Sequence, residues 1–274
     1  MAHSKHPFRT INDPYLAQAE RIIQTEFGFS VSVEEKVKNI FKFGRNPAVG
    51  TAATAYTLWA TGQDQAHEIY PAEAVNSIDS ISSDEAADGQ VMVVEGHTEA
   101  IDNHGVARKT FVEQEVTLNG VTRVALPTSL NRVSRLYNNG SVDLAGEVFV
   151  YENTALTAGK PTDTTKIHLT ILRDNQSEKA ATTLSDTDFW IITEVHTGVL
   201  NKTAAFADIS LQIRRRGKVF RTVGTFPAAN GGGDFHLVPY LIVPNNADVR
   251  LIAVASGATT DVAGSMNGYV ATTL

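Results

Sequence analysis

The chain has 274 residues, of which 42% are hydrophobic, so it can bury one large core or two ordinary ones and is not a disordered chain. Its net charge of −7 argues against a nucleic-acid-binding protein, and the absence of cysteine excludes disulfides, thiol catalysis and cysteine-ligated zinc. No stretch approaches the roughly 20 apolar residues of a membrane span, and the polar N-terminus lacks the apolar run of a signal peptide, so we expect synthesis in the cytoplasm and no membrane contact.

Two amphipathic helices are predicted at the start of the chain. The first spans residues 14–27, with Asp13 as its N-cap, and the second spans residues 33–43 and ends at Gly44. Their apolar stripes at helical spacing are Leu16, Ala19, Ile23 and Phe27 in the first, and Val33, Val37, Ile40 and Phe41 in the second. Because helices this short are marginal alone, we expect residues 1–50 to form an attachment arm. The stripes would be buried on the β body, on a neighbouring copy or on another protein.

A β pattern replaces the helical one after about residue 54. Short runs rich in β-branched and aromatic residues alternate with turn signals such as Asn119-Gly120. The small, polar stretch at residues 155–165 marks a domain boundary, which gives β domains at residues 51–158 and 159–274. In the second domain, Ile209, Leu211 and Ile213 alternate with polar residues. We therefore predict an all-β protein with two antiparallel β-sandwich domains, jelly-roll or immunoglobulin-like, behind a short α-helical N-terminal arm.

Two segments could hold a metal ion. His97 and His104, with Glu99 and Asp102 between them, could line a metal loop, and a solvated hairpin tip is the alternative. The acidic stretch at residues 83–89 could bind calcium, but it lacks the EF-hand spacing, and an exposed loop is the alternative. We expect no metal and no cofactor.

No set of residues predicts an enzyme. The GxSxG motif of serine hydrolases is absent, and the glycine run at residues 230–234 lacks the pattern of a phosphate-binding loop, so we expect it to connect two strands. A carbohydrate-binding module or a β-sandwich hydrolase would need an exposed aromatic platform. The aromatic candidates are scattered along the chain: Trp59, Tyr70, Trp190 and Tyr240.

A basic run is centred on Arg214, Arg215 and Arg216. It can be a solvated hairpin tip, because the sequence RRGK is itself a turn signal. It can also contact an acidic surface, and residues 46–107 contain ten acidic residues and no Lys or Arg. In a homo-oligomer, the basic hairpin of one copy would then face the acidic segment of the next.

Three short motifs carry a resemblance to a known family. They are EVTLNG at residues 115–120, LNRVSR at residues 130–135 and NQS at residues 175–177. In this order the chain resembles a family of tailed-bacteriophage virion structural proteins, found among marine phages in particular, over most of residues 43–274. The resemblance implies a non-enzymatic head accessory role as a decoration or cement protein, a head fibre or a neck component. It brings no catalytic residues.

These observations together predict a capsid decoration or cement protein that binds and stabilises the phage head, located in the virion after synthesis in the host cytoplasm. The expected partner is the major capsid protein or another virion protein, with homotrimers as the preferred state and no binding of nucleic acid. Alternatives are a neck, tail or head-fibre protein in fewer copies, and the carbohydrate-binding module or hydrolase. The predicted interface residues are Leu16, Ile23, Phe27, Val37, Phe41, Arg214, Arg215 and Arg216.

Overall fold

The computed structural model describes residues 37–51, 55–59, 70–171, 175–200, 206–229, 231–256 and 260–272. Within these ranges the regular structure is β-strand apart from one short 3₁₀ helix, η1 (Thr164–Lys166), and every strand pair is antiparallel. The prediction of an antiparallel all-β body is confirmed. No helix in these ranges has the length and apolar character of a membrane span. The helix predicted at residues 14–27, with Leu16, Ile23 and Phe27, lies outside the described residues.

The helix predicted at residues 33–43 is wrong for its described part. Residues from Val37 onward form strand β1 (Val37–Val49), which pairs with β18 (Thr260–Thr272) along nearly its whole length. The local spacing that suggested a helix is overridden because this segment completes the edge of a sheet, where Ile40 packs on the core and Phe41 points outward. Val37 and Phe41 therefore belong to a strand and not to a helical stripe.

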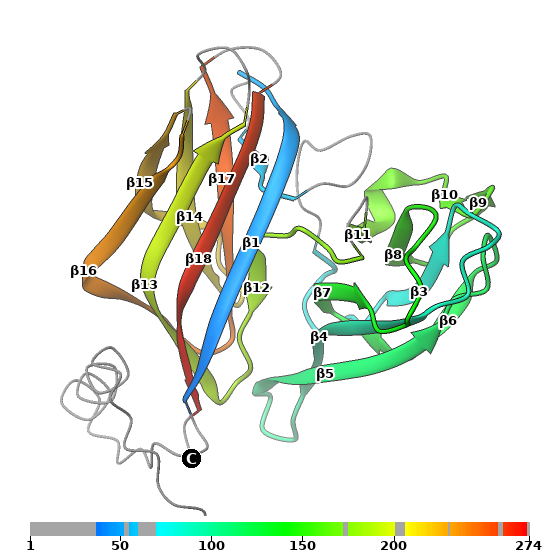
Figure 1. The fold of residues 1–274 in the computed structure, drawn as a ribbon. Helices are drawn as coiled ribbons and strands as arrows, with labels where there is room; N and C mark the ends of the chain where they lie inside the picture. Colours follow the sequence, from blue (N-terminus) through cyan, green and yellow to red (C-terminus); the bar gives the residue numbers. More distant parts are fainter. Residues whose placement is uncertain are drawn as a thin grey trace, which may run out of the picture.

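Strands β1, β2 and β12 to β18 form a sandwich of two facing sheets (Figure 1). One sheet has the order β1-β18-β13-β16 and the other β12-β17-β14-β15, with β2 also on β17. The remaining bounds are β2 Tyr56–Thr57, β12 Ala181–Thr183, β13 Asp188–Val199, β14 Ala207–Arg215, β15 Arg221–Ala228, β16 Gly233–Val243 and β17 Ala247–Ala255. If β2 and β12 count as one interrupted strand, the sheets read 1-8-3-6 and 2-7-4-5 in chain order. This order is that of an eight-stranded jelly roll.

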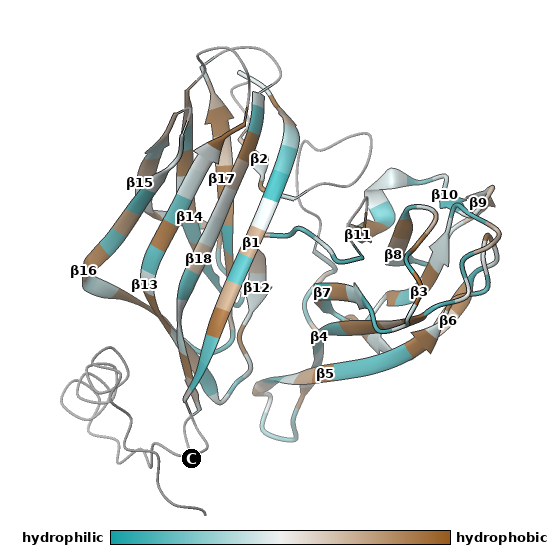
Figure 2. Cartoon of the chain, viewed as in Figure 1, coloured by the Kyte–Doolittle hydropathy of each residue, from teal (hydrophilic) through white to brown (hydrophobic). Residues whose placement is uncertain are grey.

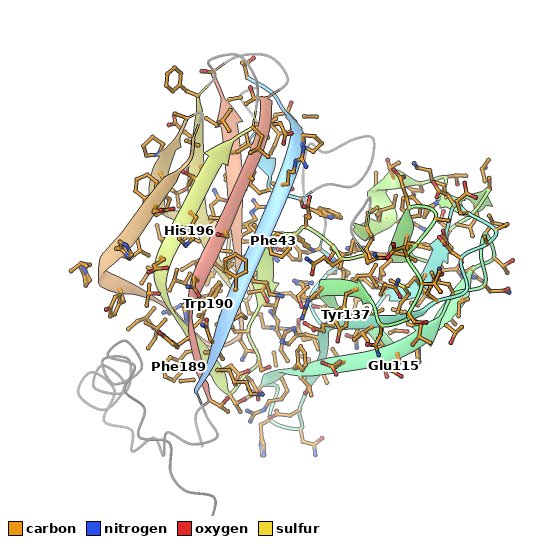
Figure 3. The ribbon with its side chains drawn as sticks, viewed as in Figure 1. Phe43, Glu115, Tyr137, Phe189, Trp190 and His196 are labelled. Atoms are coloured by element: carbon orange, nitrogen blue, oxygen red, sulfur yellow. The ribbon has the colours of Figure 1, made fainter. Side chains whose placement is uncertain are left out.

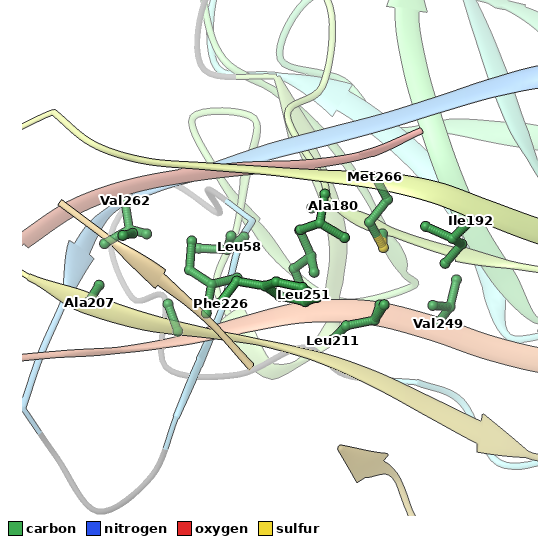
Figure 4. Close-up of a cluster of buried hydrophobic side chains, with 14 of the residues drawn as sticks. Leu58, Ala180, Ile192, Ala207, Leu211, Phe226, Val249, Leu251, Val262 and Met266 are labelled. Carbon is green, nitrogen blue, oxygen red and sulfur yellow. The ribbon is translucent and has the colours of Figure 1, made fainter. Parts of the chain in front are cut away.

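Alternating side chains fill the space between these sheets. Ile209 and Leu211 are fully buried while Ser210 and Gln212 are partly exposed, as the predicted alternation requires. Figure 2 shows the same mixture of apolar and polar residues along the strands, and Figure 4 shows the inward side chains meeting around Leu58, Leu251 and Met266. The turns predicted at RRGK and at the glycine run do join β14 to β15 and β15 to β16.

One strand of the jelly roll is interrupted by a second β body. Tyr56 of β2 pairs with Ala253, and Thr183 of β12 pairs with Asp248, so both short strands lie end to end along β17. Trp59 and Lys179 are bridge partners at the point where the chain leaves this line and returns to it. The strands between them form an inserted body, which Figure 1 shows beside the jelly roll.

The inserted body has its own two sheets and its own core. The sheets have the orders β11-β8-β3-β6 and β5-β4-β7, with a β9-β10 hairpin nearby. The bounds are β3 Ile78–Ser83, β4 Val91–Ile101, β5 Ala107–Thr117, β6 Val124–Leu130, β7 Arg132–Asn138, β8 Val148–Glu152, β9 Leu156–Thr157, β10 Lys160–Pro161 and β11 Ile167–Ile171. By these pairings β1 groups with the C-terminal strands and β11 with the inserted ones. The grouping therefore differs from the predicted boundaries at residues 50 and 158, because strand pairing joins segments distant in sequence.

Candidate functional site: a charged junction between the two bodies

A buried carboxylate lies where the inserted body meets the jelly roll. Asp248, on the outward side of β17, has a side chain only 3% exposed. Its Oδ1 accepts hydrogen bonds from Thr183 Oγ1 at 2.7 Å and from Arg132 Nε at 3.2 Å. Its Oδ2 accepts from Arg214 Nε at 3.0 Å. Lys109 Nζ lies 3.6 Å from Oδ1. Since Arg132 and Lys109 come from the inserted body, this carboxylate holds the two bodies together.

The charges around Asp248 explain its ionisation. Burial alone would raise its pKa, but Arg132, Lys109 and Arg214 outweigh that effect, and the net pKa lies far below that of an ordinary aspartate. Burial lowers the pKa of Lys109, which Asp248 partly offsets. Three cations therefore surround one permanent anion in a region with little access to water. Such a cluster is stable only while every member is present.

Aromatic rings alternate with guanidinium groups next to this carboxylate. Arg250 lies over Phe220, with its Cζ 3.8 Å from the ring centroid. Arg214 lies between Phe220 and Tyr70, at 4.5 and 4.7 Å. Arg132 lies on Tyr70 at 4.6 Å. This stack, Arg250–Phe220–Arg214–Tyr70–Arg132, continues the junction across the sheet by cation–π contacts and fixes the planes of the guanidinium groups that bind Asp248.

The basic hairpin between β14 and β15 contacts the inserted body of its own chain. Arg216 pairs with Glu99, whose side chain is fully buried, and its Nη1 lies 3.6 Å from Glu73 Oε2. The hydrogen bond to Glu99 raises the pKa of Arg216. Glu73 and Glu99 belong to the acidic stretch at residues 46–107. The charge match expected between two copies is thus present within one chain, and Arg215 is the exposed member of the three arginines.

Two further buried titratable groups face the junction. Burial lowers the pKa of His97 to about 3, and Lys109 adds to that effect, so the ring is neutral. His97 packs edge-on against Phe111 and lies 3.4 Å from Ser185 of the jelly roll. Burial also lowers the pKa of Lys42 on β1 to about 8. Lys42 Nζ donates to the carbonyl oxygen of Ser134, so it too links the two bodies.

The segments considered for metal binding have structural roles. His97 and Glu99 face the junction, whereas Asp102 caps the exposed hairpin by accepting from the backbone N–H groups of His104 and Val106. The hairpin-tip interpretation is therefore right for Asp102 and His104 and wrong for the other two. In the acidic loop, Asp88 is buried and accepts from the N–H groups of the loop at residues 145–146. Among the described residues, no group of three His, Asp or Glu side chains could hold a metal ion.

The scattered aromatic residues do not form an exposed platform. Trp59 is 2% exposed and Trp190 is fully buried. Figure 3 shows Trp190 on the sheet that also carries His196. Tyr70 belongs to the charged stack, and Tyr240 lies on the outer face of β16 beside Ile242. A carbohydrate platform made of these four side chains is thus not present.

The outer face of β13 and β16 carries a second set of charged contacts. His196 Nδ1 lies 2.7 Å from Asp234, and His236 Nδ1 lies 3.1 Å from Glu194, each across the two paired strands. Asp234 and His236 are well exposed and Glu194 and His196 partly so, and ion pairs near solvent contribute little to stability. Sequence patterns gave no sign of this pairing, because it depends on the register of strands 40 residues apart.

The junction residues were mostly missed by sequence reasoning. Asp248 comes just after Pro244, Asn245 and Asn246, residues typical of a turn, and Lys109 and Arg132 lie within ordinary strand patterns. The one available signal was the charge asymmetry, which paired the arginines of the hairpin with residues 46–107. That signal predicted a contact between the basic hairpin and the acidic segment, but it did not show that both belong to the same chain.

Comparisons with known proteins add little beyond this geometry. No protein-family model matches the chain, and no curated protein matches it. Among solved structures, the infectious bursal disease virus Gt strain is 7% identical over 95% of this chain and 78% of that chain, with a TM-score of 0.23. The VP2 subviral particle of the same virus is 9% identical over 95% and 78%, with a TM-score of 0.22. These TM-scores are too low to define a shared fold, so the class of this protein, an all-β protein with a jelly-roll strand order and an inserted β body, rests on its own strand pairing.

Proposed function

We propose that this chain is a non-enzymatic structural protein of a tailed-phage virion, acting as a decoration or cement protein on the head. The observation that carries the proposal is the jelly-roll strand order, which is widespread in viral capsid domains and also occurs in lectins and cupins. A fold alone does not fix a function. The resemblance of residues 115–120, 130–135 and 175–177 to phage virion proteins favours the virion among these classes.

The charged junction suits a protein that must hold its shape on a larger assembly. Buried ion pairs and stacked guanidinium groups hold the inserted body against the jelly roll. A protein that binds the assembled shell and not its free subunits stabilises the shell by its binding free energy. Many such contacts on one lattice then add by avidity. We propose the major capsid protein as partner and a homotrimer as the assembly state, because capsid lattices offer threefold positions.

The alternative in the same class is a neck, tail or head-fibre protein. It differs in copy number and not in chemistry, so counting copies separates the two. The buried positions of Trp59 and Trp190 weigh against the carbohydrate-binding alternative.

The test is the copy number of this chain in purified virions, measured by quantitative mass spectrometry against the major capsid protein. A decoration or cement role predicts on the order of hundreds of copies, in simple proportion to the capsid lattice. About a dozen copies would assign the protein to a closed ring at the neck or tail instead. Absence from the particle would overturn the virion proposal.

A further inference from the structure

Part of the outer face of the β1-β18-β13-β16 sheet is unusually apolar, next to the part that carries the His196–Asp234 and His236–Glu194 contacts. Residues that pair directly across strands point to the same side, and the register places one apolar set on the side opposite the core. We call this set the aromatic face: Phe41, Phe43, Phe189, Ile191, Tyr240, Ile242, Tyr269 and Ala271. Their neighbours Trp190, Ile192 and Val270 point inward to the core. The outer face of a sandwich normally carries polar residues, so this one requires a covering partner.

Part of the aromatic face is as buried as the core itself. Ile191 and Ala271 are fully buried, and Phe189 and Tyr269 are 9% exposed, whereas Phe41 at the edge is 56% exposed. Phe189, Ile191, Tyr269 and Ala271, with Tyr240 and Ile242 against them, come from neighbouring strands of one sheet, and none comes from the facing sheet. Side chains on one sheet shield each other's flanks but not their outward surface. The burial pattern therefore indicates that something lies over the end of the face near Ala271.

The chain has a segment long enough to reach that end. Strand β1 begins at Val37, whose register partner is Ala271, so the 36 preceding residues start beside the buried end of the face. Residues 28–36 can span roughly 30 Å when extended. The helix predicted at residues 14–27 would be about 21 Å long, comparable to the width of a four-stranded sheet. Its stripe of Leu16, Ala19, Ile23 and Phe27 is apolar like the face.

We propose that residues 14–27 dock through this stripe on the aromatic face of their own chain. A short tether gives an intramolecular partner an effective concentration in the millimolar range, which favours the chain's own segment over that of a neighbour. The segment then completes the sandwich as a third layer, and any partner that recruits it must compete with the aromatic face. This inference does not depend on the virion role.

Cross-linking tests the docking directly, because the chain has no cysteine. The variant pair Ile23→Cys and Tyr240→Cys, treated with a short bismaleimide, should give an intrachain cross-link. The matched pair Ile23→Cys and Thr225→Cys uses an exposed residue on the outer face of the opposite sheet and should react at least about tenfold more slowly. Peptide mapping of a mixture of isotope-labelled and unlabelled protein distinguishes intrachain from interchain products. Equal rates in the two pairs, or mainly interchain products, would overturn the proposal.

A second pair of variants tests the stripe. Phe27→Asp, added to the first pair, should lower the cross-linking rate about tenfold, because a carboxylate on the stripe cannot be buried on an apolar face. Thr25→Asp lies on the opposite side of the predicted helix and should leave the rate unchanged. If both substitutions lower the rate equally, or neither does, the stripe does not mediate the docking.

Discussion

Arg132 of the inserted body and Asp248 of the jelly roll form a buried ion pair across 116 residues of sequence, with a 3.2 Å distance between Nε and Oδ1. Both side chains are 3% exposed, so neither can be solvated if the other is lost. The position of the inserted body relative to the jelly roll therefore depends on this ion pair as well as on the backbone that connects them.

Asp248→Asn should strongly destabilise the protein. The substitution removes the negative charge that Arg132, Lys109 and Arg214 share, and breaking such a buried cluster costs about 3–5 kcal/mol. The measurement is the free energy of unfolding from urea titration at pH 7. Asp208→Asn is the matched control, since Asp208 is exposed on the same sheet, and it should change stability by less than about 0.5 kcal/mol. A loss of similar size in both variants would show that Asp248 has no special role.

Lys42→Met should stabilise the protein near neutral pH. The folded pKa of Lys42 is about 8 against an ordinary 10.5, so the unfolded state binds the extra proton between these values. The free energy of unfolding therefore rises as pH increases from 8 to 10.5, and the full cost of burying the charge is present below pH 8. Removing the charge should gain about 1–3 kcal/mol at pH 7, after the loss of the bond to Ser134.

The same variant should also flatten the rise of stability between pH 8 and 10.5. Lys38→Met, at an exposed position of the same strand, provides the comparison and should keep the wild-type slope. Thermal unfolding across this pH range gives both quantities. An unchanged slope in Lys42→Met would mean that the amine is solvated in the folded protein.

His97 should make the junction sensitive to acid. Its folded pKa is about 3 and its ordinary value 6.5, so between these values only the unfolded state binds the proton. Stability should fall as pH decreases through this window, by up to about 1.4 kcal/mol per pH unit from this residue. His97→Gln should reduce the slope, whatever its effect at pH 7. Phe111→Leu alters the ring contact without removing a titratable group, and it should keep the slope. Identical slopes in wild type and His97→Gln would refute the assignment.

Arg216→Gln should lower the free energy of unfolding more than Arg215→Gln. Arg216 neutralises the buried Glu99, so its removal should cost roughly 2–3 kcal/mol, whereas Arg215 is exposed and its removal should cost less than about 0.5 kcal/mol. Chemical denaturation of the two variants measures this difference, and size-exclusion chromatography with light scattering measures their assembly state. If Arg215→Gln alone dissociated an oligomer, the hairpin would also serve a contact between copies.

Much of the strand content could be predicted from local sequence. Alternation at Ile209, Leu211 and Ile213 is a property of a strand with one buried face, and Gly217 in the RRGK turn has the positive φ of +67° that such a turn demands. Strand β1 could not be predicted in this way. Its residues fit a helical stripe and a strand equally well, and the choice is made by β18, more than 200 residues later in the chain.

The inserted body and its junction could not be predicted from the sequence for a related reason. Local patterns show where strands are but not which strands pair, and the interruption between Thr57 and Ala181 is visible only when both segments are seen on β17. The charged cluster was hidden because its members are single residues in separate strands. Charge asymmetry along the chain still carried information, since it linked Arg216 to the segment containing Glu73 and Glu99.

The interrupted strand joins the inserted body to the jelly roll at one place on β17. The chain enters the inserted body after Trp59 and leaves it at Lys179. These two residues are bridge partners and lie beside Leu251 on β17. Asp248 is three residues further along the same strand, about 10 Å away. Because the chain enters and leaves the inserted body at this one place, noncovalent contacts must fix the orientation of that body. Asp248, together with Lys42 and Arg216, therefore supplies contacts that set the orientation of more than 100 residues.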